Sequence, residues 1–132
     1  MSVTDCIFCS IANGKIPATK VYEDAQAVAF LDIQPVAPGH VLIIPKTHHQ
    51  LMTDTPDALV AALFQLAKRL MVALQAATNA HLISLSVIGD EVPHFHIHLI
   101  PRHRDDGLSS WPRGQYADGQ AAAIAEKIKS SL

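Results

Sequence analysis

Three histidines alternate with bulky apolar residues in the run His94-Phe95-His96-Ile97-His98. Because successive side chains of a strand point to opposite faces of a sheet, this period of two predicts that all three imidazoles lie on one face. Phe95 and Ile97 then point the other way, toward a core. A strand rises about 3.3 Å per residue, so neighbouring imidazoles are about 6–7 Å apart. This spacing suits a row of side chains along one phosphate-sized group better than three ligands that close on a single metal ion.

A neutral imidazole near pH 7 can act as a nucleophile, a base or a metal ligand. A single histidine in a strand is more often structural than catalytic. Three on one face are harder to explain in that way, because each takes the place of a β-branched or aromatic residue that packs better in a sheet. The run therefore predicts a chemical site. An alternative is a catalytic metal ion held by the pair His94 and His96, or by His96 and His98, with a third ligand.

A second group of metal-ligating residue types lies outside this run. Cys6 and Cys9 form a C-x-x-C pair near the N-terminus, and His48 follows a β-branched segment that ends at Pro45. Two thiolates and one or more imidazoles can hold zinc in tetrahedral geometry. A C-x-x-C pair alone is a weak signal, and the alternative is two small buried thiols without a metal. His49 is a competing candidate for the fourth ligand.

Five short segments are expected to form the sheet that positions these residues. They are rich in β-branched and apolar residues and are bounded by turn residues. Because their connections are mostly short, we expect an antiparallel sheet and the α+β class. The expected strands cover residues 21–23, 27–32, 40–44, 83–88 and 92–100.

Three helices are expected beside the sheet. Residues 6–13 predict a short helix, and residues 120–132 have a helical composition after a loop at 109–119 that contains Trp111. Thr55 suits the N-cap of a long helix that runs to about residue 77, with Pro56 at its first position. The apolar face of this helix is predicted from leucine spacing, at Leu59, Leu63, Leu66, Leu70 and Leu74.

The composition describes one globular domain. The chain has 132 residues, of which 49% are hydrophobic and 17% charged, with a formal net charge of −2. This length can bury a core, so we expect a single domain over residues 1–132, with its motifs at about 6–104 and a C-terminal loop and helix at 105–132. Since no basic excess exists to neutralise a run of phosphates, a polynucleotide partner is not expected.

The chain offers no convincing membrane or export segment. Its longest apolar stretch, residues 59–77, contains Lys68 and Arg69, which a lipid-facing span would avoid. Residues 1–5 lack the basic region of a signal peptide. We therefore expect a cytoplasmic protein with reduced cysteines and no membrane partner.

Together, these motifs resemble the histidine triad (HIT) family of nucleotide hydrolases and transferases, in its bacterial-type branch with an N-terminal C-x-x-C pair. The resemblance covers roughly residues 6–104. It implies an α+β fold with an antiparallel sheet of about five strands, one long helix and one or two short ones, and a homodimer. The matching motifs are His94-Phe95-His96-Ile97-His98-Leu99-Ile100, Cys6-Ile7-Phe8-Cys9, Val21-Tyr22-Glu23-Asp24, Ala29-Phe30-Leu31-Asp32-Ile33, Pro38-Gly39-His40 and Ile44-Pro45-Lys46-Thr47-His48.

The resemblance implies hydrolysis or transfer at the α-phosphate of a nucleoside monophosphate conjugate, with a purine nucleotide of the adenine type. His96 would attack the phosphorus, His98 would stabilise the phosphate oxygens, and His94 would orient its neighbour. No organic cofactor is expected. The implied nucleotide-binding residues are Asp32 at the ribose hydroxyls, Ile7, Phe8, Phe30 and Ile33 around the base, and Glu91, His96 and His98.

Without the resemblance, Asp32 could equally be a turn aspartate and the four apolar residues core. In this branch of the family, the zinc ligands would be Cys6, Cys9, His48 and His94.

The segment before the triad departs from the family pattern. Residues 88–93 are fewer than usual, lack the family's upstream asparagine, and have Asp90 where a glutamine is frequent. This loop normally helps to hold the phosphate and the leaving group. An acid near a phosphate should repel it, so we expect Asp90→Gln to raise kcat/KM for adenylated substrates. A non-enzymatic nucleotide-binding or scaffold dimer remains the alternative, and the leaving group is left open among phosphoramidates, acyl-adenylates and dinucleoside polyphosphates.

Overall fold

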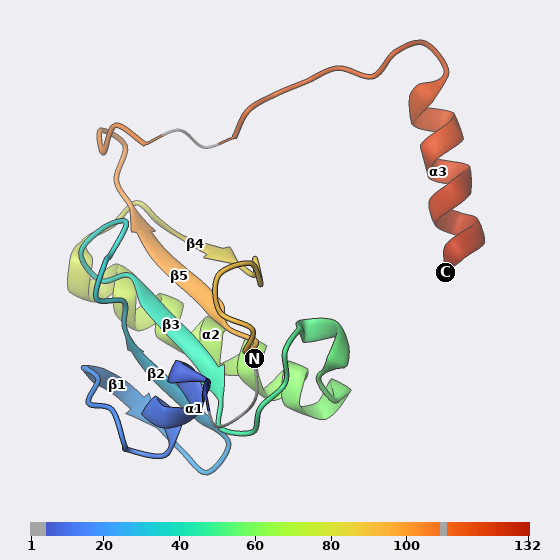
Figure 1. Ribbon diagram of the computed structural model, residues 1–132. Helices are drawn as coiled ribbons and strands as arrows, with labels where there is room; N and C mark the ends of the chain where they lie inside the picture. The colour runs from blue at the N-terminus through green and yellow to red at the C-terminus, as the bar shows by residue number, and fades with distance from the viewer. Residues whose placement is uncertain (1–4, 109–110) are drawn as a thin grey trace.

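The fold is a five-stranded antiparallel sheet with helices on both faces (Figure 1). The computed structural model describes residues 5–108 and 111–132. The strand order is β1-β2-β3-β5-β4, and every neighbouring pair is antiparallel. The expected α+β class and sheet are therefore confirmed. The strands are β1 (Lys20–Glu23), β2 (Ala27–Leu31), β3 (Val41–Pro45), β4 (Leu82–Ser86) and β5 (Ile97–Arg102).

One face of the sheet is covered by the long helix α2 (Asp57–Thr78). Leu63, Leu66 and Ala67 of this helix are buried against the sheet, as the leucine spacing predicts. Their partners alternate along the strands, because every second side chain faces the helix. The buried sheet residues of this cluster are Ala27, Ala29, Val41, Ile43, Ile97 and Leu99, with Phe95 beside them.

The opposite face carries the short helix α1 (Ile7–Ala12). Phe8, Cys9 and Ile11 of α1 are buried, and Cys6 caps the helix because its Sγ accepts from the Cys9 N–H at 3.4 Å. This cluster includes the strand residues that alternate with the first set, namely Val28, Phe30, Leu42 and Ile44. The sheet is therefore buried on both sides around β2 and β3, and α1 places both cysteines against it.

The histidine run is only partly a strand, which corrects the prediction for residues 92–100. β5 begins at Ile97, so His98 alone among the three lies in the sheet. The Phe95 N–H donates to the His49 carbonyl at 2.6 Å instead of joining a neighbouring strand, and Pro93 has no N–H to give. The alternation of sides still holds, since Phe95 and Ile97 are buried in the α2 cluster.

The start of α2 also differs from the prediction. Pro56, not Thr55, is the residue before the helix, and no side chain caps it. The Thr55 hydroxyl donates instead to the Leu51 carbonyl at 2.9 Å, next to the short 3-10 helix η2 (Met52–Asp54). The helix ends at Thr78 and is followed by Asn79, whose φ of 56° is left-handed.

A third helix, α3 (Gln120–Ser131), follows an extended segment away from the sheet (Figure 1). Residues 109 and 110 of the loop expected at 109–119 lie outside the described residues, and residues 111–117 have no regular structure. In the part of the chain that the structure describes, none of the helices is long and apolar enough to span a bilayer.

Candidate active site

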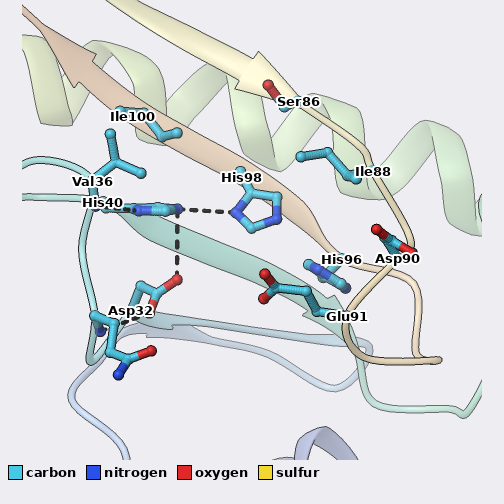
Figure 2. Close-up of a pocket in the computed structure, with 11 residues that line it drawn as sticks. Asp32, Val36, His40, Ser86, Ile88, Asp90, Glu91, His96, His98 and Ile100 are labelled. Carbon is cyan, nitrogen blue, oxygen red and sulfur yellow. Dashed lines mark hydrogen bonds and ion pairs between the residues drawn. The ribbon is translucent and has the colours of Figure 1, made fainter. Parts of the chain in front are cut away.

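A pocket of about 470 Å³ lies over the end of the histidine run. His96, His98 and Ile100 are contributed by β5 and the residues just before it. One wall comes from the segment between β2 and β3, and the other from the end of β4 and the segment after it (Figure 2). The lining residues are Asp32, Gln34, Val36, His40, Ser86, Ile88, Asp90, Glu91, His96, His98 and Ile100.

His98 is oriented by a chain of hydrogen bonds that starts at the backbone (Figure 2). The Val36 N–H donates to His40 Nδ1 at 3.1 Å. In a neutral imidazole the proton of His40 is then on Nε2, which lies 2.9 Å from His98 Nδ1. His40 therefore donates to His98, and the remaining proton of a neutral His98 is on Nε2. This tautomer makes His98 a hydrogen-bond donor at its free nitrogen.

The opposite tautomer is set for His96. Its Nδ1 lies 2.7 Å from the carbonyl oxygen of His94, and a carbonyl can only accept, so Nδ1 is the donor. A neutral His96 consequently has its lone pair on Nε2. The ring is buried, packs edge-on against Phe8 with centroids 5.1 Å apart, and stands 4.9 Å from the His98 ring. Packing and the hydrogen bond together fix one nucleophilic nitrogen beside one donor.

Burial keeps His98 and His40 neutral at pH 7. Desolvation, with smaller contributions from the charges of His96 and His40, lowers the pKa of His98 to about 4. The pKa of His40 is also lowered by burial, against the opposing effect of Asp32. Since neither ring is protonated near neutrality, the tautomers described above are the relevant forms.

Asp32 joins this network from the end of β2. Its Oδ2 is 3.8 Å from His40 Nε2, while its Oδ1 accepts the Gln34 N–H at 2.9 Å. The carboxylate therefore closes a local turn and also lines the pocket. A carboxylate held in this way can accept from two adjacent hydroxyl groups.

The four apolar residues expected around a base do not line this pocket. Phe8 and Phe30 are buried and stack edge-on with centroids 5.7 Å apart, behind His96. Ile7 is half-exposed on α1, and Ile33 is 93% exposed beyond β2. Glu91 and Asp32, which were also expected to contact the nucleotide, do line the pocket.

The sequence marks His40 only as part of the motif Pro38-Gly39-His40, whereas the structure places its side chain in the pocket. The role of His40 can be recognised from the strand pairing. His40 lies two residues before Leu42, and Leu42 pairs with His98 across the sheet. Residues two apart on a strand share a face, so His40 falls on the side of the triad. Ser86, Ile88 and Ile100 also line the pocket, and their sequence context gave no chemical signal.

A second site brings together Cys6, Cys9, His48 and His94. One ligand atom from each lies within 4.8 Å of the others. His94 Nδ1 is 3.3 Å from Cys6 Sγ and 3.5 Å from Cys9 Sγ, and His48 Nδ1 is 3.2 Å from Cys9 Sγ. His49, the competing candidate, instead has its Nε2 2.9 Å from the Thr47 hydroxyl.

This cluster fits zinc. Zn–S bonds of about 2.3 Å and Zn–N bonds of about 2.1 Å at tetrahedral angles separate S and N by about 3.6 Å, close to the distances found. His94 Nε2 donates to the Pro45 carbonyl at 2.9 Å, which leaves Nδ1 with the lone pair that a metal needs. Without a metal, burial and the neighbouring Cys6 raise the pKa of the Cys9 thiol to about 11. Zinc binding would therefore release protons.

A third cluster has suitable residue types but the wrong hydrogen bonds for a metal. Ligand atoms of Asp32, His40 and His98 also lie within 4.8 Å of one another. His40 Nε2 must carry the proton, however, because Nδ1 accepts from the Val36 backbone. A protonated nitrogen cannot ligate a metal, so this group favours a hydrogen-bonded row over a metal centre.

Comparison with known proteins agrees with this arrangement. The family model described as HIT domain matches residues 13–105. The adenosine 5′-monophosphoramidase HNT1 of Saccharomyces cerevisiae is 41% identical over 110 residues, which cover 81% of this chain and 70% of that protein. A HIT family protein from Bacillus anthracis superimposes with a TM-score of 0.86 at 35% identity, covering 97% of each chain.

A solved structure from Mycobacterium smegmatis is described as a Zn-bound histidine triad family protein. It superimposes with a TM-score of 0.77 at 31% identity, covering 99% of this chain and 100% of that one. The chain described here is a member of the histidine triad family.

Proposed function

We propose that this protein is a nucleotide hydrolase or transferase that acts on the α-phosphate of nucleoside monophosphate conjugates through a nucleotidyl-histidine intermediate on His96. The observation that carries the proposal is the 2.7 Å hydrogen bond from His96 Nδ1 to the His94 carbonyl. It leaves the Nε2 lone pair of the neutral ring available in a pocket that also contains a directed donor on His98. A neutral imidazole is a competent nucleophile.

The reaction takes place in two displacements. In the first, His96 Nε2 forms a bond to the α-phosphorus, and the bond between phosphorus and the leaving group breaks, so the leaving group departs with the electron pair. In the second, a water oxygen bonds to phosphorus and the N–P bond breaks. The pair returns to Nε2, and the water proton is released to solvent. A covalent intermediate divides one difficult displacement into two easier ones.

The other pocket residues position the phosphate and the sugar. His98 donates from Nε2 to the non-bridging oxygens, where negative charge is held through both displacements. Its orientation comes from His40. Asp32 accepts from the ribose hydroxyls, which favours ribonucleotides over deoxynucleotides. His94 acts through its carbonyl, which fixes the His96 ring.

Zinc has a structural role in this proposal. Cys6, Cys9, His48 and His94 would hold it and thereby tie the N-terminus to the end of β3 and to the triad segment. The closed set of four protein ligands, with no open position, is typical of structural zinc. The zinc-bound relative from Mycobacterium smegmatis supports this assignment.

Adenine is the proposed base, and phosphoramidates are among the proposed substrates, because the yeast relative is named an adenosine 5′-monophosphoramidase. We further propose a homodimer, since β4 forms the edge of the sheet and exposes Leu82. An unpaired strand edge is a surface on which a second copy can continue the sheet.

The test is AMP release from an AMP phosphoramidate, comparing the wild-type protein, His96→Ala and His96→Asn. We expect both variants to lose release by a factor of 10³ or more while keeping the far-UV circular dichroism of the wild type. Release should persist when a chelator is added at a concentration that leaves the folded structure intact. Tight AMP binding without release by the wild type would instead support a non-enzymatic nucleotide-binding module.

A further inference from the structure

We infer that Asp90 and Glu91 make this site select nucleotide conjugates whose leaving group carries no negative charge. The inference rests on the proposed function, because it concerns the group that His96 would displace. Both residues line the pocket and belong to the short segment between β4 and β5. Neither is part of the hydrogen-bonded row of histidines.

Asp90 lies on the side of the pocket that a leaving group would occupy. Figure 2 shows Asp32 and His40 on one side of the His96 and His98 rings and Asp90 on the other, while the Glu91 carboxylate lies beside His96 on the side that faces Asp32. A nucleotide with its ribose at Asp32 and its phosphate over the two rings directs its other phosphate substituent toward the wall that contains Asp90.

The pocket offers no positive charge to a second anionic group. Among the described residues that line it, three are carboxylates and none is a lysine or an arginine. The histidines add little, since burial keeps His98 and His40 neutral at pH 7. A polyphosphate or a carboxylate-bearing group would therefore meet two like charges and no counter-charge, and like charges at close range repel.

The wall that contains Asp90 also presents an apolar side chain. Ile88 is 69% exposed and lines the pocket there, whereas Val36 and Ile100 lie near His40 on the other side (Figure 2). Contact with Ile88 would favour an aliphatic or aromatic group. The wall therefore suits a leaving group that is uncharged and apolar, or one with an ammonium group that lies close to the two carboxylates.

Charge also matters in the displacement itself. The nitrogen of the P–N bond takes up a proton from solvent before the bond breaks, so it carries a positive charge beside Asp90 and Glu91, which stabilise it, and the amine then departs neutral with the electron pair of the bond. An anionic leaving group gains further negative charge at the same place. The carboxylates thus act on the transition state as well as on binding, and the effect is expected in kcat/KM.

The test uses three AMP phosphoramidates that share the P–N bond and have similar chain lengths but differ in charge. Their amine components are n-butylamine, β-alanine and 1,3-diaminopropane, which present a methyl group, a carboxylate and an ammonium group. For the wild type, we expect kcat/KM for the butylamine conjugate to exceed that for the β-alanine conjugate by roughly tenfold or more. The diaminopropane conjugate should be at least as good as the neutral one.

Glu91→Gln and Asp90→Asn should each lower several-fold the ratio of kcat/KM for the butylamine conjugate to kcat/KM for the β-alanine conjugate. This ratio should also fall as the ionic strength rises. Glu126→Gln in α3 is the matched control, since it removes the same charge from a residue outside the pocket and should leave the ratio unchanged. Equal rates for the three conjugates, or a ratio that the two pocket variants do not alter, would overturn the inference alone. Absence of AMP release from all three would overturn the proposed function.

Discussion

Replacement of His40 by leucine should impair catalysis, although His40 is expected to act through His98 and not to contact the phosphate itself. His40 Nε2 lies 2.9 Å from His98 Nδ1, and its own Nδ1 accepts the Val36 N–H, so it fixes the proton of His98 on Nε2. Leucine cannot donate. His98 can then adopt the tautomer that presents a lone pair, and not a proton, to the phosphate oxygens.

The size of the effect follows from the lost interactions. Loss of a single preorganised donor at a developing negative charge costs about 10²–10³ in kcat, which is the upper limit here because part of the His98 population keeps the productive tautomer. A hydrogen bond between neutral groups contributes about 0.5–1.5 kcal/mol, and the upper end of this range is equivalent to about tenfold. We expect His40→Leu to lower kcat between about 10-fold and 100-fold, with a smaller change in KM.

The assay is steady-state AMP release from an AMP phosphoramidate, with ¹⁵N NMR of the histidine side chains as a second readout. His40→Gln retains an N–H donor and should recover part of kcat, whereas His81→Leu changes an exposed histidine outside the pocket and should match the wild type. Wild-type kcat in a folded His40→Leu variant would show that the donor on His98 does not depend on His40. So would a wild-type spectrum in which His98 is protonated on Nδ1.

Other parts of the structure give further expectations. Cys9→Ala should abolish zinc in the purified protein and lower Tm; zinc content equal to that of the wild type, measured by elemental mass spectrometry, would contradict the proposed ligand set. Asp32→Ala should reduce the preference for AMP conjugates over 2′,3′-dideoxy analogues by roughly tenfold, since hydrogen bonds to a charged group contribute about 1.5–3 kcal/mol. Ile97→Ala should lower the free energy of unfolding by about 2–5 kcal/mol in denaturant titrations, because Ile97 is fully buried under α2. Metal-free protein should lose up to about 3 kcal/mol for each of His94 and His98 as pH falls from about 6.5 toward 4, because burial lowers both pKa values to about 4 and the unfolded chain binds two additional protons in that range. Equal unfolding free energies at pH 7 and pH 5 would argue against this.

Much of the fold follows from local patterns. The leucine spacing predicts α2 to within one residue at its C-terminal end, and the apolar runs predict β2 and β3 with shifts of one residue at their ends. The period of two correctly separates Phe95 and Ile97 from His96 and His98. These features depend on which face of a helix or strand each residue occupies. The spacing of apolar residues along the sequence indicates that face directly.

The start of β5 was not predictable in the same way. Residues 92–96 have the composition of a strand, but Phe95 bonds to His49, far along the chain, and His96 bonds to the His94 carbonyl. His94 consequently turns away from the pocket toward the cysteines. Residues that are remote in the sequence compete for the hydrogen bonds of this segment and thereby decide where β5 begins. A local sequence pattern contains no information about these partners.

The chemistry was predictable in its residue types and less so in its connections. The alternating histidines predicted a site at which the structure has a pocket, and the C-x-x-C pair with His48 indicated possible metal ligands that the structure brings together. The hydrogen bond between His40 and His98 joins residues 58 positions apart. The tautomers of His96 and His98 follow from hydrogen bonds of this kind. They decide which ring presents a lone pair and which presents an N–H donor, and the sequence alone does not contain them.

A covalent intermediate on His96 can be tested most directly by trapping it. Wild-type protein would be mixed with AMP phosphoramidate, quenched in alkaline denaturant, which preserves a phosphohistidine bond, and digested for mass spectrometry. We predict AMP attached to His96, formed within the first turnover and absent from His96→Asn. Turnover without any adduct, or an adduct on a residue other than His96, would contradict a nucleophilic role of His96.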